Sequence, residues 1–517
     1  MRLSEIFKRA DVPPVALSGD AEVTGLVMDS RMVRPGGCFV CMPGTTTDSH
    51  SYLAAAAAAG AIAAIVHSAD GLEEAQRRGL AVAQLPEEKM SFADAIWRIC
   101  DAFFEHPTRN MKVIGVTGTN GKTTTAWIVR DMLRALGMKA AYLGTLGFQL
   151  PDEERELSNT TPFAVDLYNL LAEARDKGVE ALAMEVSSHA LKERRVDGVE
   201  FDVGVFTNLT QDHLDYHGSM EDYEDSKWRL FSELPKQSGK EFKAVINVGD
   251  AVGALWRDRL PPQQVVSVQV VDQVTEKVSV TCKPLSVQVD HLRLGFDTGT
   301  EQGVADVNLG GAYNVENCAC AVAACLSCTD EWFSKSIEDS TAALDGVLRA
   351  LERARPVPGR FEPVPNDQGI GILVDYAHTP DALEKLLDAT RPLTTGRVIS
   401  VFGCGGDRDR TKRPKMAKAA SSRSDVTVVT SDNPRTEDPQ SILDEVLTGI
   451  EPNSQSVAII DRREAIAHAV RIAQPGDVVV IAGKGHENYQ IIGRTKYPMD
   501  DRELAREGLH RRKGASS

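Results

Sequence analysis

The chain has 517 residues, which at about 150 residues per domain predicts about three domains rather than one. It carries 58 Lys and Arg against 74 Asp and Glu, a formal charge of −16, which excludes a general binder of nucleic acid or of an anionic membrane surface. Hydrophobic residues make up 42% and charged residues 26%, as in folded globular proteins and unlike disordered or collagen-like chains.

Targeting and cysteine patterns point to the cytoplasm. The sequence contains neither the apolar core of a signal peptide nor a membrane span, so we expect a cytoplasmic protein without membrane insertion. The nine cysteines are an odd number without a disulfide framework. Two C-x-x-C pairs, Cys38 with Cys41 and Cys325 with Cys328, leave a zinc site as an alternative. We favour core positions, because GGCFVCMPG is typical of a short strand and NCACAVAACLSC of a helix.

The first domain is predicted over residues 1–108 as a small α/β unit. SYLAAAAAAGAIAAIVHS is typical of a helix packed tightly on a sheet, followed by a strand that begins with Ile62, Ile65 and Val66. A break at His106-Pro107-Thr108 then precedes the apolar strand MKVIGVTG and marks the start of a second domain.

The second domain is predicted over residues 109–355 as a larger α/β domain. ALAMEV, FDVGVFTN and KAVINVGD are continuous apolar runs of strand length, which predict a parallel sheet covered on both faces. Between Gln263 and Gly310, VSVTCKPLSVQV and HLRLGF alternate with period two, which predicts an antiparallel insert.

The third domain is predicted over residues 356–517 as a Rossmann-like α/β domain. Prolines in RARPVPGRFEPV end a helix expected from Leu344 to Arg353. Strands are expected at GIGILVDY, GRVISVFG, DVTVVTSD and DVVVIAGK, with helices at PDALEKLLDAT and SILDEVLTGI, and the basic end HRRKGASS is interpreted as a solvated tail. The expected fold class is therefore α/β in three domains, the central one a mostly parallel sheet of P-loop type with an antiparallel insert.

The strongest functional signal is GVTGTNGKTTT, residues 115–125, where an apolar strand ends in a glycine-rich turn and a helix begins. Backbone N–H groups at a helix N-terminus bind phosphate, the ammonium of Lys122 can reach the β- and γ-phosphates, and the hydroxyl of Thr123 can bind Mg²⁺. The spacing departs from the common G-x-x-x-x-G-K-[ST] pattern, since Val116 stands five residues before Gly121. A plain glycine turn is the alternative, but strand, Gly-Lys-Thr and helix follow in the order that a nucleotide site requires.

Two further strands of the second domain are followed by groups that could bind a metal ion. Glu185 ends ALAMEV, and His213 follows FDVGVFTN. Ligands of open α/β sheets bind beyond the carboxyl ends of the strands, so both side chains are expected where Thr123 points. A lone acid and a lone histidine are more often structural, but their convergence on the phosphate loop favours a site.

Ten ordered motifs resemble those of the Mur ligases of peptidoglycan synthesis, in the branch that adds the third residue of the stem peptide. They are GTNGKTTT, NTTPFAVDL, MEVSSHAL, FTNLTQDHLDYHGSMEDYEDSKWRLF, GAYNVENCACAVAA, PGRFEPV, VDYAHTPDAL, FGCGGDRDRTKRPKMA, SDNPRTEDP and AGKGHENYQ. The resemblance runs from Asp29 to about Glu487, nearly the whole chain. It implies an ATP-dependent ligase in which the D-glutamate carboxylate of the substrate attacks the γ-phosphate and an amine then attacks the acyl phosphate.

The resemblance implies four catalytic residues around the triphosphate. Lys122 and two Mg²⁺ ions would neutralise the charge that develops as carboxylate and triphosphate approach. Thr123 and Glu185 resemble ligands of one Mg²⁺, and Glu185 with His213 ligands of the second. Lys227, in DSKWRLF, matches a lysine carried as a carbamate (N6-carboxylysine) formed with CO₂, an oxygen donor that suits a hard cation. From the residue alone, a solvated helix lysine is the alternative.

The resemblance also implies sites for ATP and for the UDP-N-acetylmuramoyl dipeptide. The ATP site is expected to comprise Gly118, Thr119, Asn120, Gly121, Lys122, Thr123, Thr124, Asn314, Asn317, Arg360, Asp375, Tyr376 and His378. The UDP-substrate site is expected to comprise Asp29, Ser30, Arg31, Thr160, Thr161, Ser187 and Arg195. Asn317 alone could equally be a helix-face amide. Glu193 replaces the family's usual Gln and Ser49 its usual Gly, which leaves the detailed contacts of the UDP-substrate site open.

The incoming amino acid implied by the resemblance is meso-diaminopimelate. SDNPR resembles the signature of enzymes that add it, whereas relatives that add lysine differ at the Arg435 position. A guanidinium grips the second carboxylate of diaminopimelate bidentately and repels the distal ammonium of lysine. In isolation DNPR is a proline-containing turn. The site is expected to comprise Arg408, Asp432, Asn433, Pro434, Arg435, Gly483 and Glu487.

Other functions stay open at this point. The same ligase could add L-lysine or another diamino acid, or the chain could resemble the folylpolyglutamate synthetases, which share the phosphate loop. A P-loop ATPase without ligase activity would account for Lys122, Thr123 and Glu185 but for neither DNPR nor AGKGHE. We expect a monomer whose partners are its substrates, with no nucleic acid among them.

Overall fold

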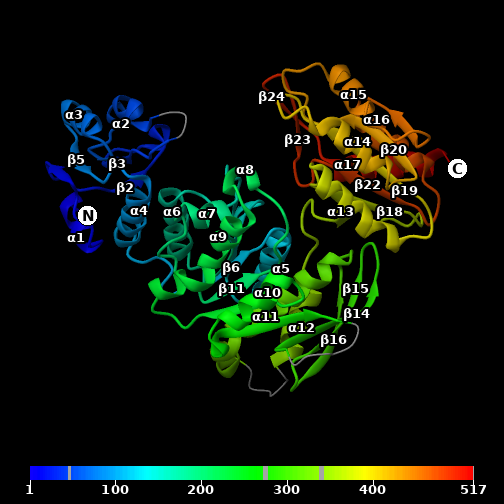
Figure 1. The fold of residues 1–517 in the computed structure, drawn as a ribbon, viewed down its shortest axis with the longest axis horizontal. Helices are drawn as coiled ribbons and strands as arrows, with labels where there is room; N and C mark the ends of the chain where they lie inside the picture. Colours follow the sequence, from blue (N-terminus) through cyan, green and yellow to red (C-terminus); the bar gives the residue numbers. More distant parts are fainter. Residues whose placement is uncertain (45–47, 272–277, 337–342, 516–517) are drawn as a thin grey trace. The chain divides into compact units, whose positions relative to one another are not determined.

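The computed structural model describes residues 1–44, 48–271, 278–336 and 343–515. They form two compact units, unit 1 with Met1–Gln269 and Cys320–Ala343, and unit 2 with Val270–Ala319 and Leu344–Ser517. Helices and strands alternate in both units (Figure 1), which confirms the predicted α/β class.

Unit 1 begins with a five-stranded sheet in the order β1-β5-β4-β3-β2, in which β1 runs antiparallel to β5 and the other pairs are parallel. Its strands are β1 (Ala16–Ser18), β2 (Gly25–Val27), β3 (Gly37–Val40), β4 (Ala63–Val66) and β5 (Ala81–Gln84). Its helices are α1 (Leu3–Arg9), α2 (Leu53–Ala58), α3 (Ala69–Arg77) and α4 (Lys89–Phe103). Apolar side chains of α1 and α4 cover one face, and those of α2 and α3 cover the other.

This sheet explains the first C-x-x-C pair. Cys38 packs in the core under α1 and α4, whereas Cys41 packs on the opposite face, because side chains along a strand alternate between faces. Cys325 and Cys328 lie in the long helix α11 (Tyr313–Ser336). All nine cysteines lie within the described ranges and are buried thiols, so the predicted core positions are confirmed.

The second sheet of unit 1 has the order β13-β12-β11-β6-β10-β7-β8-β9. The pairs from β13 to β7 are parallel, as predicted, and β8 and β9 add antiparallel at one edge. The strands are β6 (Lys112–Thr117), β7 (Ala140–Gly144), β8 (Gly147–Gln149), β9 (Glu154–Arg155), β10 (Ala181–Glu185), β11 (Val203–Phe206), β12 (Lys243–Asn247) and β13 (Val265–Val270). The helices are α5 (Lys122–Ala135), α6 (Ala164–Asp176), α7 (Ser188–Lys192), α8 (Leu214–His217), α9 (Met220–Ser232) and α10 (Ala251–Arg259).

The strand order of this sheet positions the candidate site. β6 lies between β10 and β11, with Glu185 opposite Val116 and Phe206 opposite Thr117. The segments that follow these three parallel strands therefore leave the sheet at the same edge, where open α/β sheets bind their ligands.

Unit 2 contains the predicted antiparallel insert and a second α/β layer structure. β14 (Val280–Val287), β15 (Leu292–Asp297) and β16 (Gln302–Val307) pair antiparallel, and α12 (Ala343–Glu352) follows in the chain. The C-terminal sheet has the order β17-β18-β22-β19-β20-β21, parallel except for β17. Its strands are β17 (Glu362–Pro363), β18 (Gly371–Asp375), β19 (Val398–Cys404), β20 (Val426–Ser431), β21 (Gln455–Ala458) and β22 (Val478–Ala482), and a separate hairpin is formed by β23 (Tyr489–Ile492) and β24 (Thr495–Pro498).

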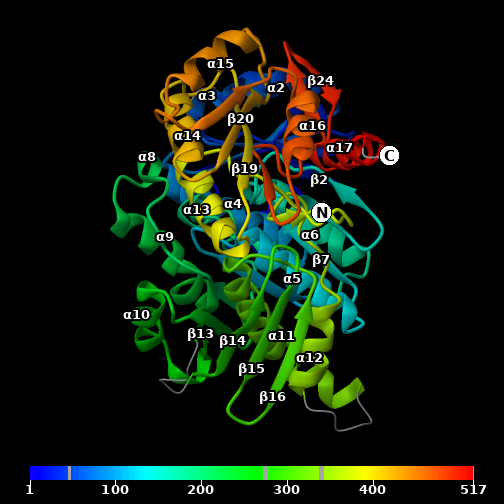
Figure 2. The same ribbon diagram turned by 90° about the vertical axis from the view of Figure 1, so that its right-hand side faces the viewer.

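Helices cover both faces of the C-terminal sheet. They are α13 (Pro380–Thr390), α14 (Lys412–Ser421), α15 (Pro439–Leu447), α16 (Arg462–Ile472) and α17 (Asp501–Ala515). Leu373 and Phe402 pack on the face under α13, α14 and α15, while their neighbours Ile372 and Val401 pack on the face under α16 and α17. Figure 2 shows these two groups of helices on either side of the sheet. This alternation explains why the strands read as continuous apolar runs.

HRRKGASS was predicted to be a solvated tail. His510, Arg511 and Lys513 are indeed exposed, but the segment is helical and continues α17 as far as Ala515. Leu504, Ala505 and Leu509 bury one side of the helix against α16, and Arg512 donates a hydrogen bond of 2.9 Å to the carbonyl oxygen of Val470. The apolar residues that dock the helix lie before the basic segment, so the composition of the segment alone did not show them. Residues 516–517 lie outside the described ranges.

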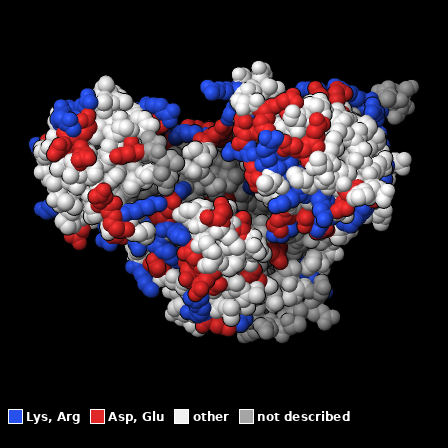
Figure 3. All heavy atoms as spheres, turned by 45° about the horizontal axis from the view of Figure 1, so that its top comes forward, with Lys and Arg blue, Asp and Glu red and all other residues white. Residues whose placement is uncertain are grey.

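The surface carries both signs of charge. On the face of the described residues drawn in Figure 3, acidic and basic side chains alternate in small groups. Within the described ranges, no helix combines the length and the apolarity that a membrane crossing requires.

Candidate active site

The loop after β6 has the shape of an anion-binding turn. Gly118 and Gly121 have φ angles of +153° and +86°, a region that favours glycine. A Cβ atom at Gly118 would lie 1.9 Å from Oγ1 of Thr207, so a larger residue does not fit. Helix α5 begins directly after the loop, and the first N–H groups of a helix have no acceptor within it. The loop can therefore present N–H donors to a phosphate.

Two lysines meet at this loop. Nζ of Lys122 donates hydrogen bonds of 2.9 Å to the carbonyl oxygens of Gly118 and Thr119, and Nζ of Lys227, on α9, donates one of 2.9 Å to the same oxygen of Gly118. Lys227 is 1% exposed, so it is not the solvated lysine of the alternative interpretation. Burial, followed by the charge of Lys122, lowers the pKa of Lys227 well below its usual range. The charged ammonium form is therefore less favoured at Lys227 than at an exposed lysine.

Glu185 and Thr123 are brought together, as predicted. Glu185 ends β10 and is 1% exposed. Its Oε2 accepts a hydrogen bond of 2.9 Å from the Thr123 hydroxyl, and its Oε1 accepts from the hydroxyl of Tyr142 and from the N–H of Thr145. Sequence analysis missed Tyr142 and Thr145, because their roles depend on the pairing of β7 with β10.

His213 lies further from this pair. It has a left-handed φ of +51°, its side chain is 46% exposed, and its Nε2 lies 3.5 Å from Asp212. Its ring centroid lies 6.1 Å from that of Tyr223, whose hydroxyl donates to Oγ1 of Thr119 at 3.2 Å. No hydrogen bond or ion pair joins His213 to Glu185 or Lys227 in the part of the chain that is described. The structure therefore links His213 to the phosphate loop through Tyr223 rather than directly.

Four of the residues predicted for the UDP substrate lie beside Glu185. The Thr161 hydroxyl donates to the carbonyl oxygen of Glu185 at 2.8 Å and accepts from the N–H of Ser187 at 3.2 Å. Arg195 donates to the carbonyl oxygen of Thr161 at 3.0 Å. The hydroxyls of Thr160 and Thr145 lie 3.1 Å apart, which connects Thr160 to the same group.

The unusual Glu193 is an ion-pair partner of Arg195. The guanidinium of Arg195 donates two hydrogen bonds, of 2.6 and 2.9 Å, to one carboxylate oxygen of Glu193, and the hydroxyl of Tyr216 donates to the other at 3.0 Å. Burial raises the pKa of Glu193, but the hydrogen bond and charge of Arg195 outweigh it, so the pKa lies below its usual range. Arg195 is therefore held by an ionised carboxylate that the family's usual Gln would not provide.

The other three residues predicted for the UDP substrate lie on the first sheet. Asp29 accepts hydrogen bonds from the N–H and the guanidinium of Arg31, the shortest at 2.6 Å. Ser30 begins the 3₁₀ turn that Asp29 caps. The side chain of Arg31 is 87% exposed. Among the described residues, no hydrogen bond joins Asp29 or Arg31 to Thr161 or Arg195, so the structure does not bring the two groups into contact.

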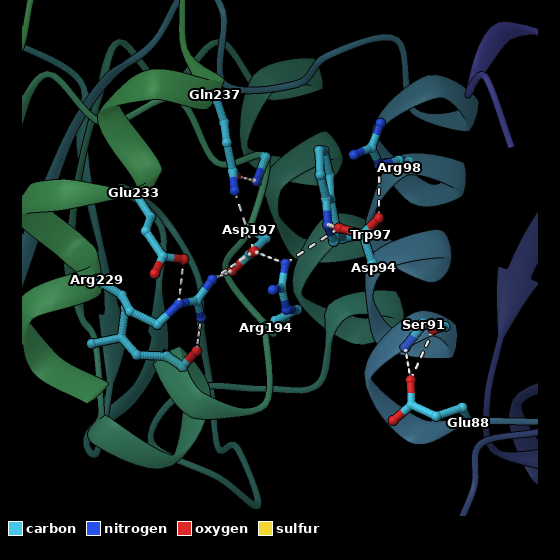
Figure 4. A network of polar contacts seen from close by, with 12 residues as sticks. Glu88, Ser91, Asp94, Trp97, Arg98, Arg194, Asp197, Arg229, Glu233 and Gln237 are labelled. Carbon is cyan, nitrogen blue, oxygen red and sulfur yellow. Dashed lines mark hydrogen bonds and ion pairs between the residues drawn. The ribbon is translucent and has the colours of Figure 1, made fainter. Parts of the chain in front are cut away.

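A buried carboxylate fixes the helix that carries Lys227. Asp197 is 0% exposed and accepts hydrogen bonds from Arg229 of α9 at 2.9 Å, from Gln237 at 3.3 Å and from Arg194 at 3.4 Å (Figure 4). Arg194 also donates to Asp94 of α4 at 3.3 Å. These hydrogen bonds join α9 to the segment that carries Asp197 and, through Arg194, to α4. Sequence analysis missed them, because the residues involved come from segments that are distant in the chain.

In unit 2, the residues predicted for ATP form two groups. Asn314 donates to the carbonyl oxygen of Gly310 at 2.7 Å, and Asn317 donates to Oδ1 of Asn314 at 2.9 Å. The second group surrounds the end of β18.

Asp375 accepts hydrogen bonds from the N–H groups of Phe361, at 2.7 Å, and Ala377, at 2.8 Å. Burial raises the pKa of Asp375 against the opposing effect of Arg360. The guanidinium of Arg360 lies 5.0 Å from the ring centre of Tyr376. The ring of Tyr376 also contacts the ring of His378.

The residues predicted for the amino acid also come together in unit 2. Asn433 donates to Oε2 of Glu487 at 3.1 Å, and a Cβ atom at Gly483 would lie 2.9 Å from Oδ2 of Asp432. Nη1 of Arg435 donates to the carbonyl oxygen of Gly406 at 2.9 Å.

The remaining two positions flank Arg435. Pro434 precedes it, and Arg435 itself has a φ of +50°. Gly405 lies between Arg435 and Arg408, since a Cβ atom there would be 2.9 Å from Nη1 of Arg435 and 3.7 Å from Cγ of Arg408.

Two buried cations that sequence analysis missed support this group. Lys484 is 0% exposed and donates to Oδ1 of Asn433 at 3.1 Å and to Oε2 of Glu487 at 3.0 Å. Arg462 pairs with Asp501 at 2.6 Å and donates to the carbonyl oxygens at the ends of β20 and β22. The position of Lys484 after the apolar strand DVVVIAG was a signal for the first, whereas nothing local marks Arg462.

Comparison with known proteins gives consistent matches along the chain. The Mur ligase family catalytic domain matches residues 22–93, the Mur ligase middle domain matches 116–325, and the Mur ligase glutamate ligase domain matches 359–485. A protein of Geobacter metallireducens named "UDP-N-acetylmuramoyl-L-alanyl-D-glutamate--2,6-diaminopimelate ligase" is 41% identical over 97% of this chain and 97% of its own. A protein of the same name from Geobacillus thermodenitrificans is 39% identical over 99% of this chain and 100% of its own.

Solved structures give the same result. A ligase with that name has a TM-score of 0.65 and 30% identity, with 95% of both chains covered. The MurF ligase of Thermotoga maritima in complex with ADP shares the fold with a TM-score of 0.59 and 17% identity, over 96% of this chain and 99% of that chain. The chain therefore belongs to the Mur ligase family.

Proposed function

We propose that the protein is an ATP-dependent ligase that joins meso-diaminopimelate to the D-glutamate of UDP-N-acetylmuramoyl-L-alanyl-D-glutamate during synthesis of peptidoglycan precursors. The observation that carries this proposal is the convergence of Lys122 and Lys227 on the carbonyl oxygen of Gly118, at the sheet edge where Thr123 and Glu185 meet. Relatives named for this reaction cover nearly the whole chain. Positive charge at this sheet edge suits a reaction in which a carboxylate must approach a triphosphate, because the two anions repel each other.

The residues at this edge divide the work. The N–H groups after Gly118 orient the β- and γ-phosphates, and Lys122 exchanges its carbonyl acceptors for phosphate oxygens when ATP binds. The D-glutamate carboxylate then attacks the γ-phosphorus and ADP leaves. The amine attacks the resulting acyl phosphate, an amide bond forms and phosphate departs.

The same edge fits a hard cation. The Thr123 hydroxyl and Glu185 carboxylate, 2.9 Å apart, are the oxygen donors that Mg²⁺ prefers, and they would hold one ion. His213 is proposed as a ligand of a second ion. When bound, Mg²⁺ supplies positive charge that shields the phosphate oxygens.

Lys227 is proposed to act as a carbamate. Its neutral amine would attack CO₂, forming an N–C bond and releasing a proton from nitrogen to solvent. Burial supports this step, because it lowers the pKa of Lys227 and so leaves the nitrogen lone pair available. The product is an anionic oxygen donor beside Lys122, whereas an ammonium there would repel a metal ion.

The proposed division of the chain follows the three predicted domains. Residues 1–108 would bind the UDP-linked substrate, 109–355 would bind ATP and 356–517 would bind the amino acid. The ranges matched by the three family models fall within these segments, which supports the division. A cytoplasmic monomer is proposed, since both substrates and ATP are cytoplasmic metabolites.

ADP release tests the function directly. Purified protein with ATP and Mg²⁺ is expected to release ADP only when both the UDP-linked dipeptide and the amino acid are present, with meso-diaminopimelate strongly preferred over L-lysine. Equal kcat/KM for the two amino acids would contradict the proposed specificity. Release of ADP without either substrate would instead indicate a simple ATPase, and release with a folate substrate a folylpolyglutamate synthetase.

A further inference from the structure

The first sheet of unit 1 holds two imidazoles and a carboxylate that the proposed reaction does not use. Asp48 caps the short turn Ser49–Tyr52, His50 lies in that turn, and His67 directly follows β4. One ligand atom of each residue lies within 4.8 Å of the others. The three side chains therefore gather at one point although β4 and the segment before it separate them in the chain.

The spacing of these atoms suits a single metal ion. Oδ1 of Asp48 lies 2.8 Å from Nδ1 of His50 and 3.9 Å from Nε2 of His67. Ligand atoms around a tetrahedral zinc ion, with bonds of about 2.1 Å, lie about 3.4 Å apart. The observed distances bracket this value. The two imidazole centroids are 4.2 Å apart with the rings inclined by 44°, so the rings do not stack flat on each other.

The ring nitrogens are buried but lack hydrogen bonds of good geometry. The side chains of His50 and His67 are only 9% and 13% exposed. Within the described residues, both ring nitrogens of His67 lack a hydrogen-bond partner, and Nδ1 of His50 has only its contact of 2.8 Å with Oδ1 of Asp48, which falls outside hydrogen-bond geometry. Buried polar atoms are almost always paired, so the lack of hydrogen bonds at these imidazoles, beside one carboxylate, needs an explanation.

The backbone makes room for the ring of His50, since a Cβ atom at Gly71 would lie 2.4 Å from its Nε2.

The tautomer of His50 must change on metal binding. The N–H of His67 points at Nε2 of His50 at 3.4 Å, a long hydrogen bond that leaves the imidazole proton on Nδ1. A metal ion at Nδ1 moves this proton to Nε2, and the long contact opens. The structure loses one weak hydrogen bond and gains a coordinate bond.

We propose that Asp48, His50 and His67 form a site for one divalent transition-metal ion of the Zn²⁺ class, with water as the fourth ligand. Two imidazoles and one carboxylate suit Zn²⁺ or Co²⁺, whereas Mg²⁺ prefers oxygen ligands alone. The ion would connect the turn before α2, through Asp48 and His50, to the end of β4, through His67. It therefore stabilises the first sheet and stands apart from the residues proposed to act on ATP.

Titration of the full-length protein with Co²⁺ in excess Mg²⁺ tests the site, because tetrahedral Co²⁺ has characteristic d–d absorption. One equivalent is expected to give these bands, and Zn²⁺ is expected to remove them. His67→Gln is expected to weaken Co²⁺ binding by about tenfold or more. His291→Gln is the matched control, since it removes another histidine paired with an aspartate, at 3.2 Å from Asp306, and is expected to leave binding unchanged. Equal binding by the wild type and His67→Gln, or no tetrahedral bands, overturns the proposal.

A second variant, Asp48→Asn, keeps the test decisive if His67→Gln does not fold. Asp48→Asn keeps a cap for the turn, because an Asn oxygen can accept the same N–H, but it removes the anionic ligand. The Tm of the wild type is expected to rise with Zn²⁺ concentration, as for any ligand that binds only the folded state. The Tm of Asp48→Asn is expected to respond far less. A Zn²⁺ response of equal size in both proteins counts against the site.

Discussion

The phosphate loop of unit 1 and the Asp432–Arg435 segment of unit 2 both follow parallel strands, but they treat charge differently. At the loop, two lysines meet one neutral carbonyl oxygen, that of Gly118. In unit 2, buried Lys484 is paired with Glu487, and buried Arg462 with Asp501. The first arrangement is completed by an anionic ligand, whereas the second is complete without one. The loop is therefore suited to chemistry on an incoming anion, and unit 2 to rigid recognition.

The largest expected effect comes from removing the buried lysine of the loop. Lys227→Ala is expected to lower kcat by about a thousandfold, roughly 4 kcal/mol, because the proposed carbamate can no longer form. Lys227→Glu is expected to retain part of the activity, since it supplies a carboxylate. ADP release measures both. An alanine variant as active as the wild type would show that the loop needs no anion at this position.

The comparison predicts a stability effect in unit 2 instead. Asp501→Asn is expected to lower the free energy of unfolding by about 3 kcal/mol, because it leaves the buried guanidinium of Arg462 without its counter-charge. Urea unfolding followed by circular dichroism measures it. Glu507→Gln is a matched control, because Glu507 lies on α17 like Asp501 but forms an exposed ion pair, with Arg463. Its loss should lower the free energy of unfolding by less than about 1 kcal/mol. Equal losses in the two variants would contradict the distinction.

Recognition in unit 2 can be tested at Arg435. Arg435→Ala is expected to lower kcat/KM for meso-diaminopimelate by about thirtyfold, roughly 2 kcal/mol, because a bidentate ion pair is lost. The kcat/KM for L-lysine is expected to rise, because the repulsion between Arg435 and the distal ammonium of lysine is removed, so the ratio of the two kcat/KM values falls. Steady-state kinetics with both amino acids give the ratio. An unchanged ratio would place recognition of the second carboxylate elsewhere.

The smallest effect is expected at the unusual Glu193. Glu193→Gln is expected to lower KM for the UDP-linked substrate two- to fivefold, below about 1 kcal/mol, because Arg195 is no longer held by a carboxylate. At neutral pH the carboxylate is ionised, since its pKa lies below the usual range, so the difference should shrink only in acid. Measurement of KM at two pH values tests this. A higher KM in the variant would show that Glu193 positions Arg195 for binding.

Local patterns predicted much of the fold. GVTGTNGKTTT predicted a strand, a glycine turn and a helix, which the structure has as β6, residues 118–121 and α5. The period-two stretch after Gln263 predicted the antiparallel strands β14 and β15. These signals lie within a few residues of the elements that they specify, so no tertiary information was needed.

The burial of single side chains and their pairing with residues far away in the chain could not be predicted from the sequence. The sequence around Lys227 fits a solvated helix, and its burial depends on a loop 109 residues earlier in the chain. Arg462 meets Asp501 across 39 residues. Such pairs are set by strand order and helix packing, which one sequence does not show. The same reason explains why the last helix was taken for a tail.

Lys227 and Arg229 stand two residues apart on α9, and at about 100° per residue their side chains leave the helix on nearly opposite sides. One points to the phosphate loop and the other to Asp197. A single inserted or deleted residue between them would swing one of these contacts away by about 100°. The spacing of these two residues within one helical turn thus connects the phosphate loop to the buried hydrogen bonds of Asp197.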